Sequence, residues 1–259
     1  TDQIADWLNF VGNNGGIATD FDSILDHWAL QGLNYYVAAR MNWNPNLSRD
    51  DVVSDYCRAG FGAGETYVEA FFRTSEDATI SKDWSEEKIA KLRDLLDAAE
   101  KAAGPGTKEA ARVAFLRIGL NLHHIHTTLT RAAEENAAGR KIDREAVHRL
   151  LTLNYVAMRD IARNHHLAVN TALLMWRSAN LARLGKIGGR NFQAAPEVLK
   201  AVEGKSMTGR ERSIAELAAV YGLDTLAIAS SAPGSSALKK PAETRVDADE
   251  EGRAIEVGN

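Results

Sequence analysis

The chain has 259 residues, of which 45% are hydrophobic and 25% are charged, and its formal net charge at pH 7 is -4. This length and composition are typical of a globular protein with one large domain or two small ones. The acidic balance argues against a nucleic-acid-binding protein, because such proteins usually carry a basic patch or a basic overall charge. The single cysteine, Cys57, excludes an intrachain disulfide and a cysteine-based metal site. No apolar run is long enough to span a bilayer and no signal peptide is recognisable, so we expect neither a membrane nor a nucleic acid as partner.

A helix and a short strand are predicted at the start of the chain. Apolar residues recur at helical spacing over residues 1–12, and a Gly- and Asn-rich cluster at residues 12–16 ends the pattern. Residues 16–23 follow glycines and are rich in β-branched and aromatic side chains, which is typical of a strand. No other strand is predicted, and a lone strand cannot satisfy its backbone hydrogen bonds. We therefore expect its partner strands to lie upstream of Thr1, in a part of the protein that this chain lacks.

Helices are predicted for most of the remaining chain, from the spacing of apolar residues and from capping and Gly/Pro stop signals. They cover residues 24–43, 48–62, 64–76, 85–103, 107–138, 143–184 and 208–222, with a break point near Asn164 in the longest of them. The long helices have short links, which favours an antiparallel bundle. The end of the chain is rich in Ser, Pro, Gly, Lys and Glu, which predicts disorder. The expected organisation is a first part at residues 1–76, a helical bundle at residues 83–225 and a disordered tail at residues 226–259.

One stretch interleaves aromatic and polar residues in a way that no simple amphipathic helix requires. It contains Asp20-Phe21-Asp22, the run His27-Trp28-Ala29-Leu30-Gln31-Gly32-Leu33-Asn34-Tyr35-Tyr36, and further on Trp43-Asn44-Pro45. On these motifs residues 1–75 resemble a family of bacterial proteins first catalogued as a domain of unknown function, whose members are similar to alpha-glucuronidases and include endo-beta-N-acetylglucosaminidases acting on N-glycans.

This resemblance implies a fold and an activity. The fold is mainly α: the terminal βα unit of a (β/α)8 barrel, with residues 16–23 as its last strand, followed by a bundle of long helices and a disordered C-terminal tail. The activity is glycoside hydrolysis by the parent protein on an oligosaccharide or glycan, without a cofactor. The resemblance also suggests a periplasmic or extracellular location.

Four residues are candidate sugar contacts at the carboxyl end of the predicted strand, where barrels place their active sites. They are Asp22, His27, Trp28 and Gln31. An aromatic ring covers the apolar C–H face of a sugar, and the polar groups bond its hydroxyls. Structural roles remain open beside this one: a helix cap for the aspartate, the core for the tryptophan, a buried hydrogen bond for the histidine and a backbone bond for the glutamine.

No residue is assigned a catalytic role. Glycoside hydrolysis usually needs two carboxylates that flank the scissile bond. Asp20 and Asp22 lie on one face of the predicted strand with Cα atoms roughly 6–7 Å apart, but one strand rarely supplies both flanks of a sugar. The resemblance places the main catalytic carboxylates on earlier barrel strands, outside this chain.

Two other functions are open. The helical bundle would serve as a non-catalytic interaction or oligomerisation module, and its resemblance to the bundle of alpha-glucuronidases suggests a homodimer interface. A metal-binding bundle is suggested by five histidines, His123, His124, His126, His165 and His166. However, the Glu-x-x-His spacing of di-iron bundles occurs once, at Glu145 and His148, and such sites need it on two helices. We therefore expect no metal.

Overall fold

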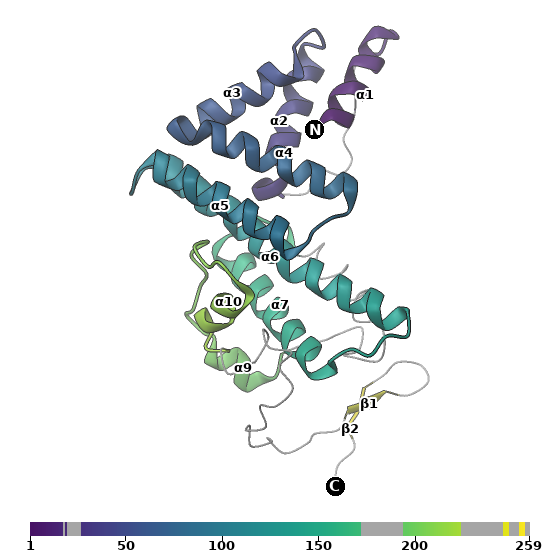
Figure 1. Ribbon diagram of the computed structural model, residues 1–259, viewed down its shortest axis with the longest axis vertical. Helices are drawn as coiled ribbons and strands as arrows, with labels where there is room; N and C mark the ends of the chain where they lie inside the picture. Colours follow the sequence, from purple (N-terminus) through teal and green to yellow (C-terminus); the bar gives the residue numbers. More distant parts are fainter. Residues whose placement is uncertain (18, 20–26, 172–193, 224–245, 249–253, 257–259) are drawn as a thin grey trace. The chain divides into compact units, whose positions relative to one another are not determined.

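The computed structural model describes residues 1–17, 19, 27–171, 194–223, 246–248 and 254–256 (Figure 1). Over this part of the chain the protein is mainly α-helical, as the sequence predicts. The chain divides into two compact units, and unit 1 comprises Thr1–His124, Ile161–Asn170 and Met207–Arg212. Unit 2 comprises Ile125–Asp160, Thr171–Ser206 and Ser213–Asn259. Among the described residues, no helix combines the length and the apolar character needed to cross a membrane.

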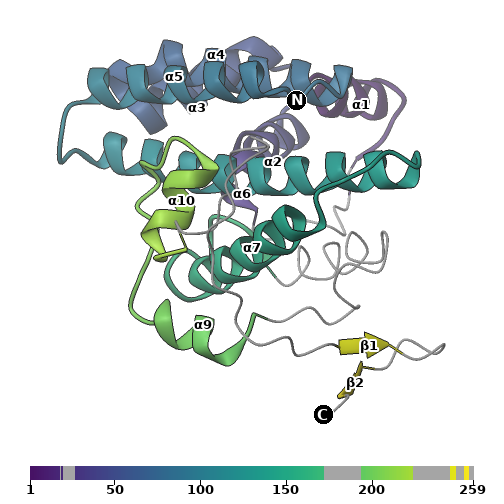
Figure 2. The same ribbon diagram turned by 60° about the horizontal axis from the view of Figure 1, so that its bottom comes forward.

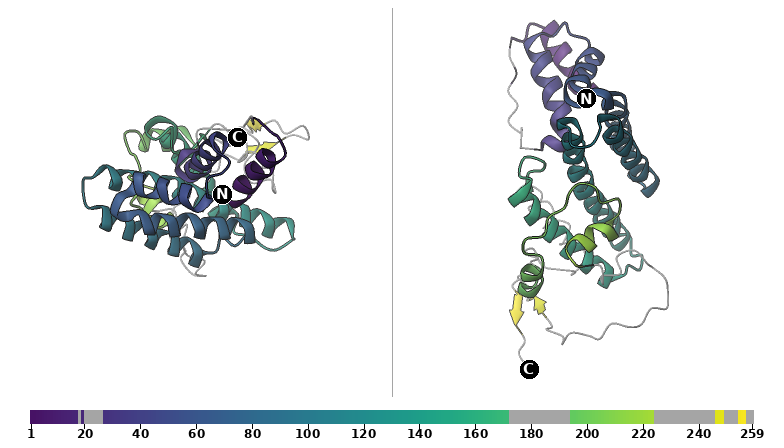
Figure 3. Two further views of the ribbon diagram at one scale, coloured as in Figure 1. Left: turned by 90° about the horizontal axis from the view of Figure 1, so that it is seen from above. Right: turned by 90° about the vertical axis from the view of Figure 1, so that its left-hand side faces the viewer.

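Unit 1 contains the first helices of the chain. They are α1 (Asp2–Asn13), α2 (Trp28–Trp43), α3 (Arg49–Phe61), the 3-10 turn η1 (Gly62–Gly64), α4 (Glu65–Ser81) and α5 (Glu86–Ala103). Within the series from α1 to α5, each helix packs against the next one along the chain (Figures 2 and 3). Two long helices, α6 (Lys108–Ala137) and α7 (Arg144–Asn164), run through parts of both units.

Capping explains where several helices begin and end. Ser85 accepts a hydrogen bond from the Lys88 backbone N–H at 3.3 Å at the start of α5, and Asp143 accepts one from the Ala146 N–H at 3.0 Å at the start of α7. The cap at Asp143 is predicted from the sequence and is confirmed, and Ser85 stands where the sequence predicts that a helix begins. Ser48 stands at the N-cap position of α3 without such a side-chain bond. The helix starts are therefore recognisable even where the cap itself is absent.

The core of unit 1 is apolar and partly aromatic. It contains fully buried aliphatic side chains from α2, α5 and α6, such as Val37, Leu92 and Leu116. Tyr56 connects two phenylalanines to this core, with ring centroids 6.0 Å from both Phe61 and Phe72. Burying such side chains is the main favourable contribution to folding.

Unit 2 contains two short helices, α9 (Pro196–Ala201) and α10 (Ile214–Val220), and a pair of antiparallel strands, β1 (Val246–Ala248) and β2 (Ala254–Glu256). The buried carboxylate of Asp160 on α7 joins this helix to two later segments of unit 2. Asp160 accepts hydrogen bonds from the Ser206 hydroxyl at 2.8 Å and from the Tyr221 hydroxyl at 2.7 Å. Because Tyr221 is only 1% exposed, its hydroxyl needs this partner.

The predicted barrel strand is not shown. Gly16, Ile17 and Thr19 have no regular secondary structure, and Ile17 is fully exposed. The other residues of the segment from 18 to 23 lie outside the described residues. The (β/α)8 unit therefore stays a prediction, while the coarser mainly α fold is established.

Two elements differ from the sequence prediction, and one predicted boundary is confirmed. Helix α7 ends at Asn164, where a break in the long helix is predicted, and the described residues 165–170 form a non-helical turn. The predicted helix at 208–222 begins only at Ile214, because residues 207–212 are held in an irregular conformation described below. In the tail predicted as disordered, β1 and β2 pair with each other, and the rest of residues 226–259 lies outside the described residues.

Candidate functional site

The candidate site lies where α2 begins, in unit 1. The Trp28 backbone N–H donates to the Leu167 carbonyl at 3.2 Å, and the Ala29 N–H donates to the Ala168 carbonyl at 3.0 Å. The first N–H groups of a helix have no partner within the helix. Here the turn at residues 165–170 supplies the acceptors, so the start of α2 is fixed by a segment far away in the sequence.

Trp28 is fixed on one side and open on the other. Its ring meets Tyr35 edge to face, with centroids 5.0 Å apart and an interplanar angle of 82°. Gly32 lies between these two residues on the helix, and a Cβ atom there would come within 2.9 Å of the Tyr56 hydroxyl and 3.8 Å of the Trp28 ring. Even so, 41% of Trp28 remains exposed. A supported and half-exposed indole is a suitable platform for the apolar face of a ligand.

Two polar candidates lie within one helical turn of this ring. The His27 Nδ1 atom accepts a hydrogen bond from the Asn170 backbone N–H at 3.2 Å, which leaves the proton of the neutral imidazole on Nε2. Gln31 is exposed, and its Oε1 accepts a hydrogen bond from the Asn34 Nδ2 at 2.6 Å. Residues three and four apart share a helix face. The structure therefore brings His27, Trp28 and Gln31 together.

The fourth candidate, Asp22, lies outside the described residues, as does Asp20. Asn34 and Asn170 add to the polar surroundings of the ring, and neither is among the four predicted sugar contacts. Asn34 follows Gln31 at i+3, so its helix spacing offered a signal. Asn170 is 143 residues from His27, and no local pattern announces that contact.

The far end of α2 carries its single charged residue, Arg40. The guanidinium donates to the Tyr36 hydroxyl at 2.6 Å and to Asp55 at 2.9 Å, and the Tyr36 hydroxyl donates to Asp55 at 2.6 Å. The hydrogen bond from Tyr36 is the largest influence on Asp55 and, with Arg40, it lowers the pKa of that carboxyl group below its ordinary value. This cluster joins α2 to α3, and its groups are satisfied by one another.

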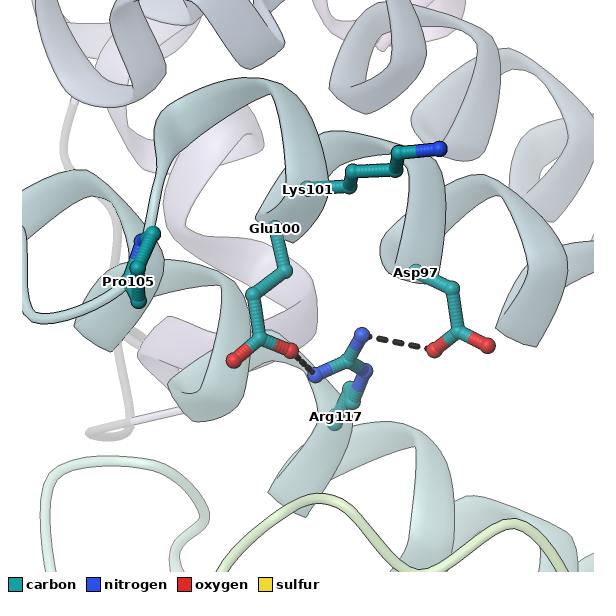
Figure 4. A pocket seen from close by; sticks show the side chains of 5 residues that line it. All are labelled: Asp97, Glu100, Lys101, Pro105 and Arg117. Atoms are coloured by element: carbon teal, nitrogen blue, oxygen red, sulfur yellow. Dashed lines mark hydrogen bonds and ion pairs between the residues drawn. The ribbon is translucent and has the colours of Figure 1, made fainter.

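A pocket of about 290 Å³ in unit 1 is lined by Asp97, Glu100, Lys101, Pro105 and Arg117 (Figure 4). Arg117 is almost completely buried, and it donates to Asp97 at 2.7 Å and to Glu100. Burial raises the pKa of Glu100, but the hydrogen bonds from Arg117 and Arg210 outweigh it and leave that pKa below the ordinary value. Because ion pairs already use these charges, the pocket is better suited to a structural role than to a ligand.

The residues Met207–Arg212, called the clasp from here on, attach to α5 and α6 by buried polar contacts. Arg93 donates to the Glu211 carbonyl at 2.5 Å and to Asn121 at 2.8 Å, and its guanidinium lies 3.1 Å from the Nδ1 atom of His124. The Glu211 carboxylate accepts bonds from the clasp's own backbone, including the Gly209 N–H at 3.0 Å. The hydrogen bonds of Glu211 and Arg93 hold the clasp in a non-helical conformation.

The histidines that suggested a metal site in the sequence contact other side chains and backbone groups instead of one another. His124 contacts Glu86 at 2.9 Å through Nε2, the His123 ring lies 4.0 Å from the Trp84 ring, and His165 contacts the Met207 carbonyl at 3.1 Å. Within the described part of the chain, no group of three His, Cys, Asp or Glu side chains is arranged to hold a metal ion.

Comparison with known proteins gives one match. The sequence model of a family described as "Domain of unknown function (DUF4838)" matches residues 2–73, which include α1, α2 and α3, most of α4 and every candidate sugar contact. No curated protein and no solved structure matches the chain. The family description names no activity, so the function must be proposed from the site itself.

Proposed function

We propose that this chain is the carboxy-terminal, mainly helical part of a carbohydrate-active, glycoside-hydrolase-like protein, and that the start of α2 supplies contacts to the glycan. The observation that carries the proposal is the half-exposed Trp28 ring, supported by Tyr35 and flanked by His27 and Gln31. The main catalytic carboxylates would come from other parts of the parent protein.

The chemistry of these groups suits a sugar. The indole ring covers the C–H face of a pyranose, which water solvates poorly. Hydroxyl groups both donate and accept, and the amides of Gln31 and Asn34 offer both kinds of partner. A few polar groups placed around an aromatic surface are the usual composition of a small-molecule site.

A second candidate is a non-catalytic interaction or homodimerisation module. The observation that favours it is the exposure of large apolar side chains on α1 and at the end of α2. Phe10 is 64% exposed and Trp43 is 91% exposed. Exposed apolar side chains that gather on one surface often mark a protein–protein interface.

Trp28 and Trp43 form a matched pair for the test, since they stand at the two ends of the same helix. The full chain and its Trp28→Ala and Trp43→Ala variants would be studied by saturation-transfer NMR with cellobiose, chitobiose and mannobiose. We expect saturation transfer to at least one disaccharide, its loss in Trp28→Ala and its retention in Trp43→Ala.

Binding of none of the three sugars, or equal loss in both variants, would contradict the sugar-contact proposal. Sedimentation velocity on the same samples tests the second candidate. A dimer that dissociates in Trp43→Ala and persists in Trp28→Ala would support the interaction module.

A further inference from the structure

Helix α3 contributes a tyrosine, Tyr56, whose ring and hydroxyl group have different surroundings. Its ring packs against three other aromatic rings, with centroids 5.4 Å from Tyr36 and 6.0 Å from both Phe61 and Phe72. In contrast, no residue that the structure describes forms a hydrogen bond with the Tyr56 hydroxyl group. The packing therefore fixes the direction of this phenol without using its polar atom.

The Tyr56 hydroxyl lies beside the Trp28 ring, next to Gly32 of α2. A Cβ atom at Gly32 would come within 2.9 Å of the phenol oxygen and within 3.8 Å of the Cε3 atom of Trp28. The phenol and the indole therefore reach the same point on α2 from two sides. Trp28 is half exposed, and the Tyr56 oxygen is not fully enclosed. A molecule that covers the indole thus lies within reach of the phenol.

The chemistry of this hydroxyl suits a hydroxyl group of a ligand. Burial is the main cause that raises the pKa of Tyr56 to about 12, so the phenol is protonated at pH 7 and both donates and accepts hydrogen bonds. A polar group that is partly withdrawn from water and has no protein partner costs free energy until water or a ligand bonds it.

The neighbouring phenol of Tyr36 shows the opposite case. Its hydroxyl donates to Asp55 at 2.6 Å and accepts a hydrogen bond from Arg40 at 2.6 Å. The rings of Tyr36 and Tyr56 are in contact, but only the Tyr36 hydroxyl is used to join α2 to α3. Of these two phenols, that of Tyr56 is the one available to a ligand.

We infer that the Tyr56 hydroxyl is a further ligand contact, which forms a hydrogen bond with a hydroxyl group of the sugar seated on Trp28, and that Gly32 keeps this phenol accessible. The inference rests on the proposed function and adds two residues to the same site. Glycine inside a helix is unfavourable relative to alanine. At Gly32 the missing side chain leaves room in front of the phenol oxygen.

The removal of single oxygen atoms tests the role of Tyr56. In urea denaturation, Tyr56→Phe should not lower the free energy of unfolding, because the hydroxyl has no partner among the described residues, whereas Tyr36→Phe should lower it. The full chain would also be titrated at pH 7 with cellobiose, chitobiose and mannobiose and followed by saturation-transfer NMR. Tyr56→Phe should weaken the affinity for a disaccharide that binds by about threefold to tenfold. Tyr67→Phe, which removes an exposed phenol of α4, is the control and should change neither quantity.

A second substitution blocks the hydroxyl instead of removing it. Gly32→Ala places a methyl group against the phenol oxygen, and it should weaken the affinity by a similar factor. In the double variant Gly32→Ala/Tyr56→Phe the two losses of affinity should not add, because both substitutions act on the same hydroxyl group. Additive losses would overturn the role assigned to Gly32.

The possible failures are distinguishable. If Tyr56→Phe binds the disaccharide as tightly as the unmodified chain while Trp28→Ala loses it, the inference is wrong and the proposed sugar site stands. If Tyr56→Phe lowers the free energy of unfolding as much as Tyr36→Phe, the hydroxyl has a structural role and the inference is overturned, whichever sugar binds. If none of the three disaccharides binds the unmodified chain, both the inference and the proposed function are contradicted.

Discussion

The start of α2 and the clasp are both places where an irregular segment meets the helices of unit 1, but they use polar groups in opposite ways. At the clasp, Glu211 is 7% exposed and its partner Arg93 on α5 is 5% exposed. The Arg93 guanidinium donates to the Glu211 carbonyl, and the Glu211 carboxylate accepts a bond from the Gly209 N–H. At the start of α2, by contrast, Trp28 is 41% exposed and the Gln31 amide is in solvent. Polar groups that saturate one another hold a structure together, whereas polar groups beside an exposed ring are available to a ligand.

The largest expected effect is on the clasp side of this comparison. Arg93→Ala leaves Asn121, His124 and the Glu211 carbonyl without the guanidinium that bonds them. Removing one member of a buried charged network typically costs about 3–5 kcal/mol. The free energy of unfolding, measured by urea denaturation, should fall by that amount.

The control for this measurement is Arg112→Ala. Arg112 also bonds a backbone carbonyl, that of Gly60 at 2.9 Å, but its side chain is half exposed. Its removal should cost less than about 1 kcal/mol. Similar losses for the two variants would show that the clasp is no more than a surface contact.

The second prediction concerns the backbone of the clasp. Gly209 has φ +79°, and a Cβ atom there would come within 2.3 Å of the Ala114 carbonyl oxygen. Gly106 has a similar φ of +75° with nothing within 4 Å of its Cβ position. Gly106→Ala should therefore cost only the left-handed strain, about 1–2 kcal/mol, and Gly209→Ala should cost about 1–3 kcal/mol more because a neighbour must move.

Thermal unfolding of the two glycine variants measures this difference directly. Equal melting temperatures would mean that the clasp backbone does not approach α6 as closely as described. Because the strain is common to both variants, the comparison isolates the contact between Gly209 and Ala114.

A third prediction tests the core beneath the site. Burial is the main cause that raises the pKa of Tyr56 to about 12 and the pKa of the neighbouring Cys57 thiol to about 12. Groups whose pKa is raised by folding stabilise the native state fully below their unfolded pKa and lose that contribution as pH rises through the folded value. Stability should therefore decline from about pH 9 toward pH 12.

Two measurements follow this decline. In a pH titration, the part of the tyrosinate absorbance that belongs to Tyr56 should appear only at the pH at which the protein unfolds. The Cys57 thiol should resist a thiol reagent at pH 8 until denaturant is added. Rapid modification of the thiol in the native protein at pH 8 would contradict the burial of this part of α3.

The sequence predicts the helices better than their long-range partners, and the physical reason is visible in particular residues. The caps at Ser85 and Asp143 act within three residues, so they are readable from the sequence. The bond from Arg93 to the Glu211 carbonyl spans 118 residues, and a helical pattern through residues 208–222 gives no sign of it. Tertiary hydrogen bonds here override local propensity.

The candidate site shows the same division. Trp28 and Gln31 are identified from residue type and helix spacing, and the structure places them together with His27. The break near Asn164 is predicted from the sequence, but the bonds from the start of α2 to the turn at residues 165–170 are not, because they join segments far apart in the chain. His123 and His124 suggested a metal by their proximity in sequence, but the His123 ring contacts Trp84, in the loop before α5, and His124 contacts Arg93 of α5.

The smallest expected effect on stability is at the start of α2. Its size decides whether Trp28 belongs to a binding surface or to the core. The Trp28 ring contacts the Tyr35 ring edge to face, so Trp28→Ala should cost about 1 kcal/mol of stability. Trp43 is almost fully exposed, so Trp43→Ala should change stability by no more than about 0.5 kcal/mol. Both values lie well below the expected cost of Arg93→Ala. A loss of more than about 3 kcal/mol for Trp28→Ala, measured by urea denaturation, would place the ring in the core. A small loss of stability combined with a complete loss of sugar binding is the pattern that separates a ligand platform from a structural anchor.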